Sequence, residues 1–186
     1  MRKNFGPKPF LYPQLVMVIA SYDKDGTPDA MNAAWGGIAG GDKIFLCLSS
    51  NHKTVENILE RKAFTVSVAD EAHLVEADYV GLVSGNDVPD KLERSGLHAT
   101  RSEFVDAPVI DELPLVLECK LVSYDPDSHF MVGRIVNAGA DEAILDEAGM
   151  IDPARLKPLT FDPANGAYWS LGEKVGKAFS DGGKLR

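Results

Sequence analysis

The feature that most constrains the fold is a long β-hairpin in the second half of the sequence. Two strand-like segments, Leu113 to Tyr124 and His129 to Ala138, flank the turn Asp125-Pro126-Asp127-Ser128. Apolar and polar side chains alternate along the first segment, with Leu115, Leu117, Cys119 and Leu121 on one face and Glu118 and Lys120 on the other. This alternation on both sides of a short turn predicts antiparallel β-structure.

Shorter strands are expected on both sides of this hairpin. Apolar, β-rich segments bounded by turn residues occur at Leu15 to Ala20, Pro28 to Ala34, Lys43 to Ser49, Phe64 to Val68, Leu159 to Phe161 and Ala167 to Leu171. The cluster Asp23-Lys24-Asp25-Gly26 marks a turn between the first two of them. Because Lys43 to Ser49 is apolar at nearly every position, we expect this strand to be buried on both faces.

Helical spacing interrupts the strands near the middle of the chain. Thr54 to Lys62 places Val55, Ile58 and Leu59 on one face with charges opposite, and Ala72 to Leu82 shows a similar spacing. Ser84 to Pro108 is rich in turn formers and charges, so we expect a long irregular excursion with one helical turn around Lys91 to Arg94. About eight strands with two or three inserted helices favour a closed, mainly β barrel in a single domain over residues 1–186.

Charge and composition exclude several classes of protein. The net charge of −9 disfavours binding to nucleic acid or to an anionic membrane. No apolar run approaches the roughly 18 residues that span a bilayer and no signal peptide is evident, so a cytoplasmic location is expected. The two cysteines, Cys47 and Cys119, lie in apolar strand-like runs and are expected to be small buried hydrophobes. The four histidines show no metal-ligand spacing, so no metal site is predicted.

The segment Ser49-Ser50-Asn51-His52-Lys53-Thr54 joins a strand to the start of the amphipathic helix. Free backbone N–H groups and the positive end of the helix dipole meet hydroxyl, amide and ammonium groups there. This combination predicts a phosphate site. The alternative is an ordinary capped helix, with Thr54 as N-cap and Lys53 in solvent.

A second candidate segment is Ala30 to Gly37, in which small residues and glycines surround Asn32 and Trp35. Small side chains let a planar ligand approach the backbone, whose amides can then bond to the ligand's polar edge. The alternative is a tight barrel corner with a core tryptophan. The spacings of the Rossmann and P-loop motifs are both absent, and no nucleophile elbow occurs.

The order of these segments resembles the flavin reductase-like, FMN-binding split-barrel family, and within it the flavoredoxin group. The likeness covers most of the chain and rests on Asp25-Gly26, Asn32-Ala33-Ala34-Trp35, Ser49 to Ile58, Phe64 to Val68, Ala77 to Gly81, Asp90-Lys91, Ser95-Gly96-Leu97, His129 to Val136 and Tyr168 to Gly172.

The resemblance implies a Greek-key-like split β-barrel that forms a homodimer, with non-covalent FMN near the dimer interface. The cofactor ligands it implies are Met31, Asn32, Ala33, Ala34, Trp35, Ser49, Ser50, Asn51, His52, Lys53, Thr54, Lys91 and Tyr168, with His129 near the substrate. For Lys91 a solvated role, for His129 a structural role in a strand and for Tyr168 a core position remain open.

A bound flavin would supply the redox chemistry, so the sequence designates no catalytic acid, base or nucleophile. Three functions follow as hypotheses. The first is an NAD(P)H-dependent flavin reductase or related oxidoreductase. The second is a flavoredoxin-type electron carrier with no small-molecule substrate of its own, and the third is a flavin-free split barrel that binds another ligand.

Overall fold

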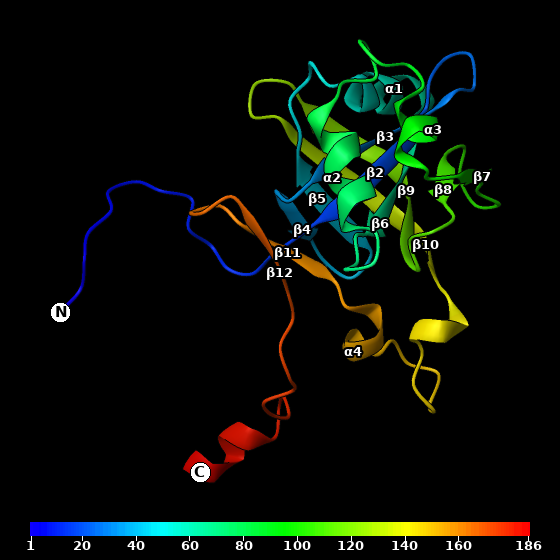
Figure 1. The fold of residues 1–186 in the computed structure, drawn as a ribbon. Coiled ribbons are helices and arrows are strands. Elements are labelled where there is room, and N and C mark those ends of the chain that lie inside the picture. Colours follow the sequence, from blue (N-terminus) through cyan, green and yellow to red (C-terminus); the bar gives the residue numbers. More distant parts are fainter.

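The computed structural model describes residues 1–186 and is built around one curled antiparallel sheet (Figure 1). Its seven strands lie in the order β3-β2-β6-β9-β10-β5-β4. Their bounds are β2 Met17–Tyr22, β3 Pro28–Ala33, β4 Gly36–Ile38, β5 Lys43–Cys47, β6 Ala63–Val68, β9 Leu115–Asp125 and β10 Phe130–Ala140.

The connection between β3 and β4 explains why the sheet curls. These two strands form opposite edges of the sheet, yet only Ala34 and Trp35 separate them in the sequence. The sheet must therefore bend round until its edges come within reach of a two-residue link. No hydrogen-bonded ladder joins the two edges, so the prediction of a closed barrel is wrong and the sheet is a half-barrel with an open seam at Ala34 and Trp35.

Two smaller sheets flank the half-barrel. The first contains β1 (Gln14–Leu15), β11 (Leu159–Asp162) and β12 (Ala167–Ser170), and the second pairs β7 (Ala99–Arg101) with β8 (Pro108–Ile110). With twelve strands, some of only two or three residues, the structure exceeds the expected count of about eight. The short strands lie at turns, where side-chain alternation is too brief to be recognised in the sequence.

The helices are short and flank the sheet, and α1 contributes Val55 and Ile58 to the core cluster inside the half-barrel. Their bounds are α1 Lys53–Arg61, α2 Leu74–Leu82, α3 Lys91–Ser95 and α4 Pro153–Leu156, with 3-10 turns η1 Glu142–Ile144 and η2 Asp181–Leu185. The amphipathic helix predicted at Thr54 to Lys62 is confirmed, because α1 buries Val55 and Ile58. None of these helices is long and apolar enough to cross a membrane.

The core has two main parts, one on each side of β2 and β6. Met17 and Ile19 of β2 pack with the side chains inside the half-barrel, among them Phe64 and Met131, whereas Val16, Val18 and Ala20 pack against α2, α3 and the β1-β11-β12 sheet. Strand β6 is buried at every position because both of its faces are covered. These two strands are the middle layer of the molecule.

The long hairpin is confirmed as β9 and β10, whose ladder contains two bulges. One other sequence expectation is wrong. Strand β5 is buried on one face only, since Ile44 and Leu46 point inward while Phe45 stacks on Phe130 outside, with ring centroids 5.5 Å apart. Glu118, although on the polar face of β9, is buried, because Ser102 and Asn137 bond to it.

The excursion Ser84 to Pro108 is more regular than predicted. It contains α3 over the expected helical turn and then β7, which pairs with β8 directly after the excursion. The cysteines also differ from one another. Cys119 is fully buried as expected, but Cys47 is only half-buried, at the end of β5.

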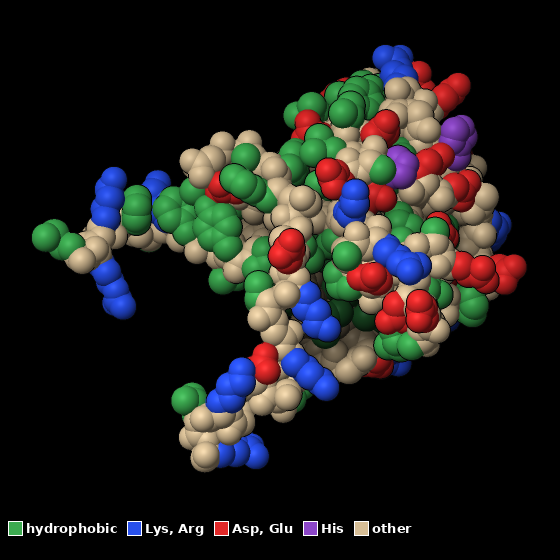
Figure 2. Space-filling model, turned by 60° about the horizontal axis from the view of Figure 1, so that its bottom comes forward, with side chains coloured by type: hydrophobic (Ala, Val, Ile, Leu, Met, Phe, Trp, Pro, Cys, Tyr) green, Lys and Arg blue, Asp and Glu red, His purple; other side chains and the backbone are tan.

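Two extended arms leave the body of the molecule. Residues 1–13 and 171–186 reach into solvent in Figure 1, and Figure 2 shows Lys and Arg side chains along both. Large apolar side chains of the arms are exposed, including Phe5, Leu11, Val175 and Phe179. The arms therefore present apolar surface that their own chain does not cover.

Candidate functional site

A cavity of about 630 Å³ lies where the start of α1, the seam between β3 and β4 and the loop after α2 meet. A volume of this size suits a cofactor or another ligand of moderate size. The cavity brings together most of the residues predicted from the sequence, namely Met31, Asn32, Ala33, Trp35, Asn51, His52, Lys53, Thr54 and Lys91.

The start of α1 forms the polar end of the cavity. The backbone N–H groups of Lys53 and Thr54 have no hydrogen-bond partner, and the preceding residue His52 provides no side-chain cap. The Thr54 hydroxyl donates to Asp29 instead of capping the helix, so the capped-helix alternative is wrong. Two free N–H groups at the positive end of a helix form an anion site.

Lys53 adds a positive charge beside these groups. Its ammonium nitrogen lies 3.5 Å from Glu56, and about a quarter of its side chain is exposed. An exposed pair of this kind contributes little to stability, so Lys53 can exchange this partner for a ligand at small cost.

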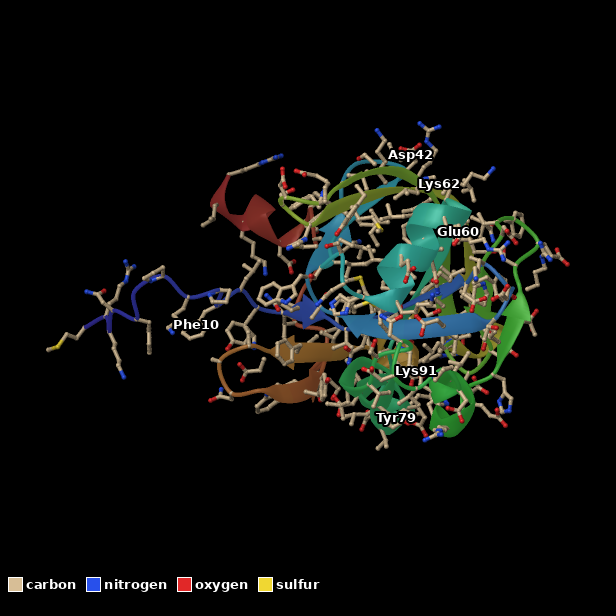
Figure 3. All side chains as sticks on the ribbon, turned by 90° about the horizontal axis from the view of Figure 1, so that it is seen from above. Phe10, Asp42, Glu60, Lys62, Tyr79 and Lys91 are labelled. Atoms are coloured by element: carbon tan, nitrogen blue, oxygen red, sulfur yellow. The ribbon has the colours of Figure 1, made fainter.

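A buried ion pair supports the cavity from beneath. Lys91 is 2% exposed, and its ammonium nitrogen lies 3.1 Å from an Asp29 carboxylate oxygen. The same nitrogen donates to the carbonyl oxygens of Val80 and Val83 at the end of α2. Figure 3 shows Lys91 between β3 and the helices α2 and α3. The solvated alternative for Lys91 is therefore wrong.

The electrostatics at the cavity wall affect His52. Loss of hydration, followed by the positive charge of Lys91, lowers the pKa of this imidazole below its ordinary value, while Asp29 opposes the shift. His52 therefore stays neutral at pH 7 and is available as a hydrogen-bonding group there.

The apolar end of the cavity is the seam loop. Trp35 is 44% exposed, which rules out the core-tryptophan alternative. The Asn32 side chain lies directly over Gly81 of α2, where an added Cβ would stand 2.0 Å from its Oδ1. Only glycine at this position lets β3 and α2 approach closely enough to hold Asn32 at the cavity wall.

A second cavity of about 270 Å³ adjoins the first across Asn32, Ala33 and Trp35. It is here that the structure places Ala34 and Tyr168. The Tyr168 hydroxyl donates to Asp78 at 2.7 Å, and burial together with this carboxylate raises the pKa of Tyr168 to about 12. Tyr168 is half-buried, lines this cavity and packs against the core cluster beside α2.

Three predicted site residues lie outside both cavities. Ser49 and Ser50 belong to the loop before α1, and the Ser49 carbonyl accepts from the His52 N–H. His129 precedes β10 with a positive φ of 61°, and its carbonyl accepts from the Leu48 N–H. The structure places His129 at the hairpin turn.

Several residues that shape the site were not among those predicted from the sequence. Asp29 anchors both Lys91 and Thr54, Asp78 bonds to Tyr168, and Gly81 accommodates Asn32. Residues 82–87 complete the wall of the larger cavity. An acidic residue inside the short apolar strand 28–34 was the one available signal, since a buried carboxylate requires a partner.

Comparisons with known proteins identify the family and the fold. A family model described as "Flavin reductase like domain" matches residues 10–165. The flavoredoxin of Desulfovibrio vulgaris (Miyazaki F) is similar in structure with a TM-score of 0.94 and 35% identity, covering 98% of this chain and 100% of that chain.

Two further solved structures share the architecture. A flavoredoxin from Methanosarcina acetivorans gives a TM-score of 0.90 at 27% identity, covering 100% of both chains. An FMN-binding domain of a flavin reductases-like enzyme from Shewanella baltica OS155 gives 0.78 at 23% identity, covering 88% of this chain and 89% of that chain. This last likeness concerns the fold alone.

Proposed function

The chain belongs to the flavin reductase-like domain family, and we propose that it is an FMN-binding oxidoreductase whose larger cavity holds the cofactor. The observation that carries this proposal is the start of α1, where two unpartnered N–H groups open into a cavity that also contains Lys53. These groups suit the phosphate of FMN.

The residues present fit the cofactor at both ends of the cavity. Lys53, Thr54 and the first turn of α1 would hold the phosphate, while Asn51 and His52 would bond to the chain between phosphate and ring. Asn32, Ala33 and Trp35 would lie against the ring, because small residues and an aromatic plane suit a flat ligand. The free polar groups lie at one end of the cavity and the small residues at the other, as FMN requires.

When bound, FMN supplies hydride and single-electron transfer. The protein's own contribution would be to orient the flavin ring and to tune its redox potential. The buried pair of Lys91 with Asp29 fixes Thr54 and the end of α2, and Gly81 keeps Asn32 at the wall. No side chain is assigned as proton donor or nucleophile.

A purified, FMN-loaded sample tests the enzymatic proposal. NADH and NADPH are added anaerobically while the visible flavin absorption is followed. Bleaching by either nicotinamide supports an NAD(P)H-dependent reductase. Protein that takes up FMN but bleaches with neither contradicts the reductase and leaves an electron carrier.

The electron carrier is the second candidate. It is favoured by the likeness to the Desulfovibrio flavoredoxin over nearly the whole of both chains. In that case, a reduced carrier protein should bleach the flavin when the nicotinamides do not. A protein that takes up no FMN would contradict both candidates and favour a flavin-free binding protein.

We also propose that a second copy of the chain completes the site. Trp35, Ile38 and Phe130 are exposed around the seam, and the arms carry uncovered apolar side chains. Burying this apolar surface would stabilise association. The outer parts of the two arms extend away from the body and can cover a neighbouring copy, whereas Tyr12 bonds to Asp162 and residues 171–175 line a hollow beside α4.

A further inference from the structure

The smaller cavity lies next to the seam loop and shares a wall with the larger one. Asn32, Ala33, Trp35, Gly81 and Leu82 line both. A molecule in the smaller cavity would therefore contact the same loop that faces the proposed ring position. The two cavities are adjacent but differ in chemistry.

Most walls of the smaller cavity are apolar. Val16, Leu82 and Phe161 line it, and the rings of Phe161 and Tyr168 lie 6.1 Å apart at 53° to one another. A volume of about 270 Å³ has room for a single small ring system and not for a dinucleotide. The shape thus suits one planar aromatic group.

Three polar side chains line this cavity, Asn32, whose amide can donate as well as accept, and the acceptors Asp78 and Tyr168. Asp78 takes the Tyr168 proton on Oδ1, while its Oδ2 has no hydrogen bond and the carboxylate has no ion pair with Lys, Arg or His. Because the pKa of Tyr168 is raised to about 12, its hydroxyl keeps the proton at neutral pH and continues to donate to Asp78. The phenolic oxygen then offers only lone pairs to a ligand.

We propose that this smaller cavity, called here the acceptor pocket, binds the small redox substrate and selects a planar aromatic group that carries an N–H donor and a positive charge. The free oxygen of Asp78 recognises the donor. That the ligand is a redox substrate rests on the proposed function. The preference of the pocket for a cationic ligand depends only on its own side chains.

Charge explains the selectivity. Because the Asp78 carboxylate has no cationic partner in the protein, a cationic ligand can form a charge-assisted hydrogen bond with it without displacing one. A ligand carboxylate would instead bring a second negative charge against Asp78 and would leave the acceptors unpaired.

Two probes of nearly equal shape test the acceptor pocket, benzamidine as the cation and benzoate as the anion. Binding is measured on FMN-free protein by the fluorescence of Trp35 and Trp169 and by NMR shifts. Benzamidine should bind about tenfold or more tightly than benzoate. Equal affinities, or tighter binding of benzoate, would overturn the proposal.

Two variants test whether the preference for benzamidine depends on Asp78. Asp78→Asn should reduce the preference to about twofold or less, since the amide carries no charge. Glu76→Gln changes the same charge on the same helix but lies outside both cavities, so it should keep the preference. A preference that survives Asp78→Asn, in protein whose NMR spectrum remains folded, would also overturn the proposal.

The same titrations on FMN-loaded protein distinguish a failure of the proposed FMN binding from a failure of the proposed selectivity of the acceptor pocket. If benzamidine perturbs the visible flavin spectrum, the acceptor pocket adjoins the cofactor. If FMN binds and the probes do not discriminate, this inference fails and the proposed function stands. If FMN does not bind but benzamidine is preferred, the proposed function fails and the selectivity of the pocket stands.

Discussion

The ammonium nitrogen of Lys91 lies 3.1 Å from a carboxylate oxygen of Asp29, and both side chains are almost completely buried. Asp29 belongs to β3 and Lys91 begins α3, so the pair joins two elements far apart in the sequence. Because Asp29 also accepts from Thr54 at the start of α1, one carboxylate fixes three parts of the cavity wall.

Removing one partner of this pair should cost stability. Lys91→Met leaves the Asp29 carboxylate buried without a cation, so the free energy of unfolding should fall by about 3 to 5 kcal/mol. Urea unfolding measures the change. Arg94→Met serves as the control, because its pair with Asp90 is exposed on both sides and should contribute less than about 1 kcal/mol. Equal losses in the two variants would contradict the role of Lys91.

Lys53→Ala should lower the affinity for FMN by about one to two decades, since a charge-assisted contact to phosphate contributes roughly 1.5 to 3 kcal/mol. Riboflavin, which lacks the phosphate, should bind almost as before. Flavin fluorescence titrations give both affinities. If the variant weakens both ligands equally, Lys53 does not bind the phosphate.

The histidines should titrate on opposite sides of their ordinary pKa. Loss of hydration and the charge of Lys91 lower the pKa of His52, whereas the hydrogen bond to Glu112 raises that of His98. The depressed folded-state pKa of His52 means that its contribution to stability is present above the unfolded value of about 6.5 and is lost as the pH falls below it. NMR titration of both rings measures the order.

The same titration reports on the cofactor. A bound phosphate dianion near His52 should raise its pKa and leave that of His98 unchanged. A His52 pKa that is higher than that of His98 without FMN, or insensitive to FMN, would contradict the geometry of the anion site.

Gly81→Ala should damage the site through Asn32. The added Cβ would stand 2.0 Å from the Asn32 Oδ1, so this side chain must leave its position at the seam. Strain of this kind typically costs about 1 to 3 kcal/mol, and FMN affinity should fall by roughly one decade or more. Gly41→Ala is the matched control, because an added Cβ there meets no atom within 4 Å. Unchanged affinity in Gly81→Ala would show that Asn32 is not a ligand.

Dimerisation and FMN binding should be coupled. If the second copy completes the pocket, FMN must stabilise the dimer, and FMN-free protein should dissociate at higher concentration than loaded protein. Sedimentation over a dilution series, with and without FMN, measures this. A monomer that holds FMN stoichiometrically at normal affinity would refute the shared pocket.

Much of the local structure could be predicted from periodicity. The hairpin of β9 and β10 and the helix α1 lie within a few residues of their predicted bounds, because alternation and amphipathic spacing are local signals. Strand β5 was misjudged for a physical reason. An apolar residue such as Phe45 can be covered by a stacking partner on the outer face, and the sequence of the strand does not contain that partner.

The sequence alone determined the two candidate cofactor segments, since a helix start with Lys53 and Thr54 and a small-residue loop around Asn32 are each contiguous. Only the tertiary structure decided how they meet. The sheet curls until β3 and β4, its opposite edges, are joined through Ala34 and Trp35, and this seam adjoins the start of α1. Buried partners such as Asp29 with Lys91 and Asp78 with Tyr168 are separated by long stretches of chain. Their pairing depends on packing between elements, and local sequence patterns carry no record of it.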